Sequence, residues 1–165
     1  MRKIIVLTLF FGLLGGTLHA QSRAERRAEE AEVARLITQL VETGRFRVDL
    51  TKINATNGQE INLSNNPSLI IRGDSVFSDL PYYGNNYNYN MSTNNNLSFR
   101  GEMTDYKFNV DRRNNSSVSF RVTVPEGVHR FSIRIMPNGL VDVAATPAGR
   151  QMIRYQGVIS TKPVD

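Results

Sequence analysis

The chain has 165 residues, a formal net charge of +5, two histidines and no cysteine. The missing cysteines exclude thiol catalysis and cysteine-based metal sites, and the length fits one domain with an adequate hydrophobic core. The excess of positive charge is too small to indicate nucleic acid as a partner.

Residues 1–20 have the layout of a secretory signal peptide. Arg2 and Lys3 form a basic start, an apolar run follows from Ile4 to Leu18, and Ala20 ends the segment. The apolar run is shorter than the ~20 residues that a bilayer-spanning helix needs. We therefore expect an exported protein that does not span the membrane after signal removal. An export signal without any cysteine favours the periplasm or the cell exterior of a Gram-negative bacterium.

Residues 22–43 predict one helix, which makes up most of an N-terminal charged segment at 21–44. The first half is charged on all sides and rich in good helix formers, and Gly44 predicts the C-terminal stop. The second half carries an apolar stripe at helical spacing, so we expect its turns to dock on a core. The first turns should project, as a solvated helix end or alternatively as a partner-binding arm. The stripe consists of Val33, Leu36, Ile37, Leu40 and Val41.

From residue 45 to residue 165 the hydrophobic period changes to two, which is typical of half-buried strands. Turn signals such as Asn57-Gly58 separate the short strands, so the pattern predicts an antiparallel meander. The fold class is therefore all-β, barrel-like or a sandwich, with one N-terminal helix. The expected strands are 46–54, 59–63, 68–72, 75–79, 97–101, 105–111, 117–124, 129–135, 140–145 and 151–159.

The sequence carries no phosphate-binding loop, dinucleotide loop, zinc-protease motif, serine elbow or calcium loop. We therefore expect no cofactor, no metal site and no catalytic residue, and we favour a protein that is not an enzyme. His129 is the one histidine after the signal, and we expect it at the surface or in a turn. A hydrolase with a carboxylate pair stays open as an alternative, because such pairs form only in space. The acidic residues near predicted loops are Asp74, Asp79, Glu102 and Asp105.

Three arginines in the hairpin 117–135 suggest an anion-binding site. If the hairpin turns at Glu126-Gly127, position 121 lies opposite 132 and position 119 opposite 134. Arg121 would then lie diagonally close to Arg130 and Arg134 on the outward face. Three guanidinium groups without an acidic partner in the hairpin suit an anionic ligand. Asp105 or Asp142 on neighbouring strands would neutralise them, and a solvated basic face is the alternative.

The segment 78–90 reads Ser-Asp-Leu-Pro-Tyr-Tyr-Gly-Asn-Asn-Tyr-Asn-Tyr-Asn. Asp79 and Pro81 should break the preceding strand, and Leu80, Pro81 and either Tyr82 or Tyr83 should pack at a corner. The later tyrosines alternate with asparagines and suit exposed contacts with sugars or peptides. The candidate ligand-binding residues of this segment are Asp79, Tyr82, Tyr83, Tyr87 and Tyr89.

Four segments together resemble an exported bacterial family that is catalogued as domain of unknown function 4251. They are Asp74-Ser-Val76, Ser78-Asp-Leu-Pro-Tyr-Tyr-Gly84, Ile61-Asn-Leu63 and Tyr155-Gln-Gly-Val-Ile159. The resemblance spans nearly the whole chain and implies export and a single-domain architecture. It adds no catalytic residue and no substrate.

These observations favour an exported, non-enzymatic module of the bacterial envelope that binds a ligand or partner. A glycan, a peptide or an envelope component would suit the exposed tyrosines. The alternatives are a small exported hydrolase and a purely structural envelope protein.

Overall fold

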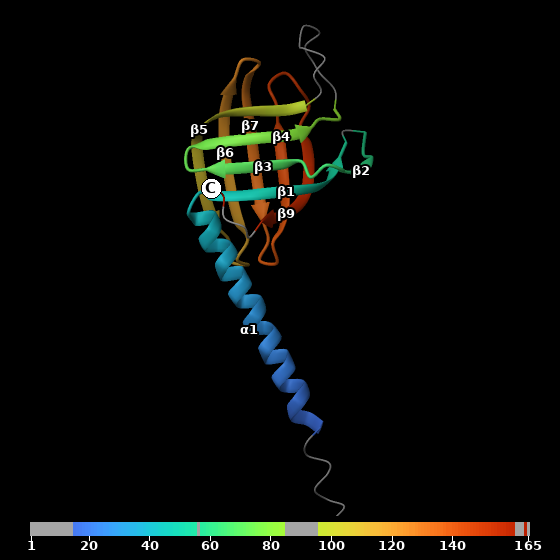
Figure 1. Ribbon diagram of the computed structural model, residues 1–165, viewed down its shortest axis with the longest axis vertical. Helices are drawn as coiled ribbons and strands as arrows, with labels where there is room; N and C mark the ends of the chain where they lie inside the picture. The colour runs from blue at the N-terminus through green and yellow to red at the C-terminus, as the bar shows by residue number, and fades with distance from the viewer. Residues whose placement is uncertain (1–14, 56, 85–95, 161–163, 165) are drawn as a thin grey trace, which may run out of the picture.

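The computed structural model describes residues 15–55, 57–84, 96–160 and 164, with side chains from residue 23 onwards. One helix, α1 (Gly15–Glu42), precedes a set of antiparallel strands (Figure 1). The strands are β1 (Arg45–Asn54), β2 (Glu60–Asn62), β3 (Ser68–Arg72), β4 (Ser75–Pro81), β5 (Asn96–Val110), β6 (Ser116–Val124), β7 (Gly127–Ile135), β8 (Leu140–Thr146) and β9 (Ile153–Ser160).

α1 docks on one end of the strands through its last turns only. Ile37 and Val41 are buried, whereas Val33 and Leu36 remain 41% and 53% exposed, so the predicted apolar stripe is only partly used. Gly44 ends the helix as expected, with a φ of 65° and an N–H that donates to the Val41 carbonyl at 3.0 Å. The helix begins seven residues earlier than predicted and projects away from the strands (Figure 1).

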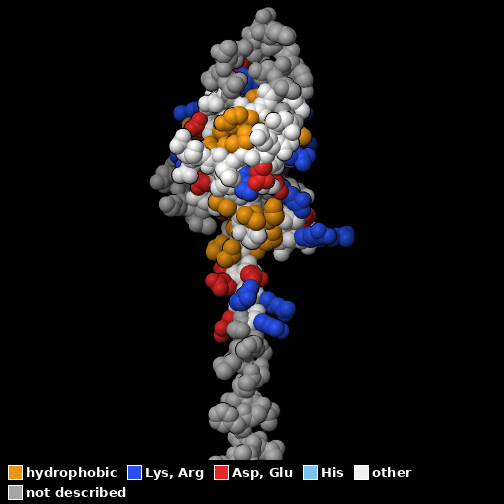
Figure 2. Space-filling model, turned by 90° about the vertical axis from the view of Figure 1, so that its right-hand side faces the viewer, with side chains coloured by type: hydrophobic (Ala, Val, Ile, Leu, Met, Phe, Trp, Pro, Cys, Tyr) orange, Lys and Arg blue, Asp and Glu red, His pale blue; other side chains and the backbone are white. Residues whose placement is uncertain are grey.

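The exposed part of α1 is strongly charged. Figure 2 shows acidic and basic side chains along it and hydrophobic side chains gathered where it meets the strands. Within the described residues, no helical segment is both long enough and apolar enough to cross a lipid bilayer.

The period-two pattern places the strand ends within two residues of those observed, and differences in β4 and β5 affect the surface described below. The segments predicted at 97–101 and 105–111 are one long strand, β5. β4 also continues through Asp79 and ends at Pro81. Because a strand's last residue can lack an N–H without loss of an interior ladder bond, Pro81 ends β4 rather than breaking it earlier.

The strands close into a barrel rather than forming a sandwich. Neighbours pair in the order β1-β3-β4-β5-β6-β7-β8-β9, and β9 pairs back onto β1. β2 adds only a short extra pairing, between Glu60–Asn62 and the end of β1. Closure pairs both edges of the sheet, which removes the exposed edges that a long meander would otherwise present.

Two strands, β5 and β1, carry bulges that bend the sheet, so that the barrel has a front and a back layer of strands. β5 pairs with β4 up to Glu102 and with β6 from Met103 onwards, with an irregularity between Thr104 and Lys107. Asp105 occupies this bulge with a φ of 54°, which is uncommon for a residue other than glycine. β1 carries a second bulge, between Leu50 and Lys52, opposite β9. As a result, β1, β3 and β4 run across the front of the steeper strands β6 to β9 (Figure 1).

The inward side chains fill the barrel. An eight-stranded barrel is just wide enough for its own side chains, or for one small ligand. Here the interior positions are buried and mostly apolar, with Ser78 and His129 among the polar exceptions, so a recognition site is sought at the outward positions. The largest fully buried side chains include Tyr82, Tyr155, Phe46, Leu50, Ile71, Leu80 and Ile133.

Two buried tyrosines link the end of β4 to the start of β9. The Tyr82 hydroxyl donates to the Gln151 carbonyl at 2.8 Å, and the Tyr155 hydroxyl donates to the Pro81 carbonyl at 2.9 Å. Burial, followed by the nearby Tyr82, raises the pKa of Tyr155, so its hydroxyl keeps its proton and acts as a donor. Two of the segments that carry the family resemblance therefore meet here as parts of the architecture.

His129 lies at the same end of the barrel, and it is buried rather than at the surface as expected. Its Nδ1 accepts a hydrogen bond from the Ala148 N–H at 3.0 Å, and its ring contacts Phe99 edge-on, with centroids 5.3 Å apart. Burial lowers the pKa of His129, and Arg150 lowers it further, whereas Glu126 opposes the shift. The neutral ring is thus the form that fits this site.

We expect the protein to lose stability when the pH falls below about 6.5, the usual histidine pKa. Below that value the unfolded chain takes up a proton on His129 that the folded protein resists, because the folded pKa is lowered. The contribution is fully present above about pH 6.5 and declines as the pH falls through the folded pKa. Thermal unfolding between pH 5 and pH 8 measures this dependence. A His129→Gln variant should show a shallower decline, and an unchanged decline would assign the effect to other groups.

Candidate functional site

The outward face of β5 to β9 carries a row of small side chains between arginines. Pairing places Lys107, Ser119, Ser132, Ala144 and Arg154 directly opposite one another along one line across five strands. Residues opposite each other in antiparallel strands point to the same side of the sheet. We call this line the central rung, and its three small residues form a floor with a cationic side chain at each end.

Arginines flank the central rung on both sides. Arg121 and Arg130 are directly opposite each other on one side, and Arg134 lies opposite Asp142 on the other. We call these four flanking residues and the central rung the arginine face. Two hollows occupy it, of about 310 Å³ and 170 Å³, and they adjoin at the Ser119–Ser132 pair.

Positive charge exceeds negative charge on the arginine face and its immediate border. The residues that line the two hollows include five cationic side chains and two carboxylates, those of Asp105 and Asp142. Arg121 forms an ion pair with Asp105 at 3.1 Å. Within the described residues, no carboxylate oxygen lies within 4 Å of the guanidinium groups of Arg130, Arg134 or Arg154.

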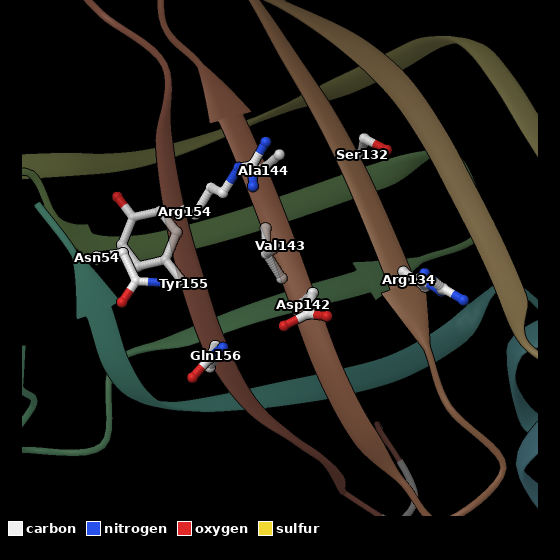
Figure 3. A pocket seen from close by; sticks show the side chains of 9 residues that line it. All are labelled: Asn54, Ser132, Arg134, Asp142, Val143, Ala144, Arg154, Tyr155 and Gln156. Atoms are coloured by element: carbon white, nitrogen blue, oxygen red, sulfur yellow. The ribbon is translucent and has the colours of Figure 1, made fainter. Parts of the chain in front are cut away.

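The close view explains why Asp142 does not neutralise Arg134. Figure 3 shows the Arg134 side chain turned away from Asp142, while Arg154 reaches across towards Ala144. The pKa of Asp111 is lowered mainly by hydrogen bonds from Asn115 and to a smaller extent by the charge of Arg134. Arg154 and Asp142 therefore both remain available on this surface.

The predicted arginines do share one face, but the predicted register is wrong. The hairpin turns at Pro125 and Glu126, so position 121 lies opposite 130 rather than 132, and 119 lies opposite 132 rather than 134. The shift brings Arg121 and Arg130 closer together than expected and moves Arg134 to the other side of the central rung. The expectation that Asp105 neutralises part of this cluster is confirmed by its ion pair with Arg121.

The tyrosine-rich segment separates into an inner and an outer part. Tyr82 is buried, with its hydroxyl bonded to Gln151, so it packs in the architecture as one of the two predicted corner tyrosines. Tyr83 points outward and is 48% exposed. Asp79 is exposed and accepts a hydrogen bond from the Ser98 hydroxyl at 2.8 Å. Tyr87 and Tyr89 lie outside the described residues.

Sequence reasoning missed Arg154 and Lys107 as members of the arginine face. Arg154 reaches the face because β9 pairs with β8, and Lys107 reaches it because the β5 bulge resets the register. The alternating burial of β9 places Arg154 on the outer surface, but nothing in the local sequence indicates which strand lies beside it.

The four acidic residues considered for a hydrolase are exposed. Asp74 and Glu102 are neighbours at one end of the β4–β5 pairing, whereas Asp79 lies towards its other end. One of the four, Asp105, forms an ion pair with Arg121. Among the residues that the structure describes, no group of three or more histidines and carboxylates is arranged to hold a metal ion.

Comparison with known proteins supports the architecture. A crystal structure of a DUF4251 family protein from Bacteroides eggerthii DSM 20697, at 1.95 Å resolution, superposes with a TM-score of 0.60 and 14% sequence identity. The match covers 80% of this chain and 89% of that chain, so the two share a fold. No curated protein matches the chain. The model of the family described as "Domain of unknown function (DUF4251)" matches residues 28–159, and the chain therefore belongs to the DUF4251 family.

Proposed function

We propose that the domain is an exported, non-enzymatic binding module whose arginine face holds an extended anionic ligand. The observation that carries this proposal is the row of small residues flanked by Arg130, Arg134 and Arg154, three arginines that form no ion pair within the described residues. An acidic polysaccharide is the ligand class that fits best, because it presents carboxylate or sulfate groups at intervals along a chain.

The charge arrangement favours an external anion over a merely solvated surface. Two like charges directly opposite on neighbouring strands destabilise a sheet, and Arg121 and Arg130 are such a pair. One carboxylate, Asp105, engages Arg121 and leaves Arg130 without a partner within the described residues. A bound anion would relieve the repulsion and would gain charge-assisted hydrogen bonds from planar guanidinium groups.

The shape of the face favours an extended ligand. The central rung crosses from β5 to β9, and four strand spacings correspond to about 19 Å. Its floor of Ser119, Ser132 and Ala144 allows a ligand backbone to approach the sheet closely. Arg154 and Lys107 at the two ends would then meet charges that are separated along the ligand.

Heparin binding to the purified protein tests the proposal. We expect the double substitution of Arg130→Ala and Arg154→Ala to weaken binding at least about tenfold, because each lost charge-assisted hydrogen bond contributes about 1.5 kcal/mol or more. Binding by the unchanged protein should also weaken with added salt, since the attraction is between exposed charges. Surface plasmon resonance on immobilised heparin measures both effects.

A charge-matched control separates site binding from net charge. Arg23→Ala with Arg27→Ala removes the same two charges from the exposed part of α1, and we expect it to change binding less than twofold. If both double variants weaken binding equally, the attraction is nonspecific and the proposed site is wrong. Absence of heparin binding by the unchanged protein would also contradict the proposal.

A further inference from the structure

A separate hollow lies on another part of the barrel, beside the end of β4. It has a volume of about 250 Å³ and is formed by the end of β4, the start of β5 and the segment between β2 and β3. We call it the tyrosine pocket, and none of its lining residues belongs to the arginine face. Its lining includes Tyr83, Asp79, Pro81, Asn62, Asn65 and Asn96.

Tyr83 gives this pocket an exposed aromatic wall on a rigid base. Its side chain is 48% exposed, although the preceding Tyr82 is 2% exposed. The backbone on its N-terminal side is held twice, by the Tyr82 hydroxyl on Gln151 and by the Tyr155 hydroxyl on the Pro81 carbonyl. Because this backbone is held and a tyrosine side chain has only two χ angles, a ligand that stacks on the ring costs little conformational entropy.

The remaining wall is polar and includes one carboxylate. Asp79 Oδ1 accepts the Ser98 hydroxyl at 2.8 Å, and within the described residues its Oδ2 has no hydrogen-bond partner. The amides of Asn62, Asn65 and Asn96 each provide donors and an acceptor. Asn65 also adopts a φ of 72°, a left-handed conformation that is uncommon outside glycine.

We propose that the tyrosine pocket binds a neutral sugar ring. A pyranose has an apolar C–H face that packs on an aromatic ring and hydroxyl groups at its edge that both donate and accept hydrogen bonds. Tyr83 matches the apolar face, and Asp79 with the asparagine amides matches the hydroxyl groups. The volume corresponds to about eight water molecules, which is room for one ring rather than for a long chain. Among the described residues that line the pocket none is cationic, so an acidic sugar would meet the charge of Asp79 there.

A glycan microarray that carries neutral and acidic oligosaccharides, followed by titration with the best neutral glycan, tests this site. We expect Tyr83→Ala to weaken neutral-glycan binding at least tenfold and Asp79→Ala to weaken it several-fold. Tyr83→Phe keeps the stacking ring, so its affinity should stay within about threefold. Tyr106→Ala removes another exposed tyrosine, on β5, and serves as the matched control with unchanged binding.

The arginine variants show which of the two proposals fails, the anionic ligand on the arginine face or the neutral sugar in the tyrosine pocket. Arg130→Ala with Arg154→Ala should leave neutral-glycan binding unchanged while it weakens heparin binding. The sugar site is contradicted if no neutral glycan binds, if Tyr83→Ala binds as well as the unchanged protein, or if the arginine substitutions abolish the neutral-glycan signal. None of these outcomes would alter the heparin result.

Discussion

Replacement of Gly157 by alanine is expected to lower the free energy of unfolding by at least about 3 kcal/mol. Gly157 lies on β9 opposite the bulge of β1. An added Cβ would overlap the carbonyl oxygen of Asp49 and lie 2.8 Å from the Cα of Leu50. Both atoms belong to the backbone, so no side chain can move aside, and β1 and β9 would have to separate. Chemical denaturation followed by circular dichroism measures the loss.

Gly73→Ala is the matched control for this substitution. Gly73 has a φ of 60°, and an added Cβ there would meet no atom within 4 Å. This change should therefore cost only about 1 kcal/mol, from the left-handed conformation alone. If the two variants unfold at the same denaturant concentration, the close approach of β1 to Gly157 does not limit barrel closure.

The second large effect is expected at Tyr155. Tyr155→Ala should lower the free energy of unfolding by about 4 kcal/mol, because it empties a fully buried ring position and removes a buried hydrogen bond. Tyr155→Phe keeps the ring and removes only the hydroxyl that donates to Pro81, so it should cost about 1–2 kcal/mol. The difference between the two variants separates ring packing from the link between β4 and β9.

Tyr83→Ala provides the comparison for Tyr155→Ala. Its ring is exposed, so the loss should stay within about 0.5 kcal/mol. This variant is also the one that should lose the sugar site, and a normal unfolding curve would show that a binding defect is not a folding defect. A loss at Tyr83 as large as that at Tyr155 would mean that the outer tyrosine is structural as well.

Alternation alone predicts most of the strands, because the order of polar outward and apolar inward residues can be read from each short segment by itself. Alternation could not show that 97–101 and 105–111 are one strand. The bulge at Asp105 and Tyr106 places two residues opposite one, which breaks the period without ending the strand. Alternation also could not predict that the barrel closes, since closure depends on the pairing of β1 with β9, which are separated by more than half of the sequence.

The arginine face was only partly predictable for the same reason. Arg121, Arg130 and Arg134 are close in sequence, and their common face follows from period two. Their register depends on the position of one turn. The turn lies at Pro125-Glu126 rather than at Glu126-Gly127, and this one-residue move shifts the partner of every paired residue by two. Arg154 is contributed by the last strand, so only the closed sheet places it beside Ala144.

Pairing of the first strand with the last also has a kinetic consequence. β1 pairs with β9 through residues such as Val48 and Ile159, which are separated by most of the domain. Contacts of such long sequence separation form slowly, because the closure of a long loop must precede any gain from pairing. Until residue 160 is available, β1 and β8 each keep an unpaired edge, and an incomplete chain is therefore prone to aggregation. The barrel can therefore close only after residue 160 has been synthesised.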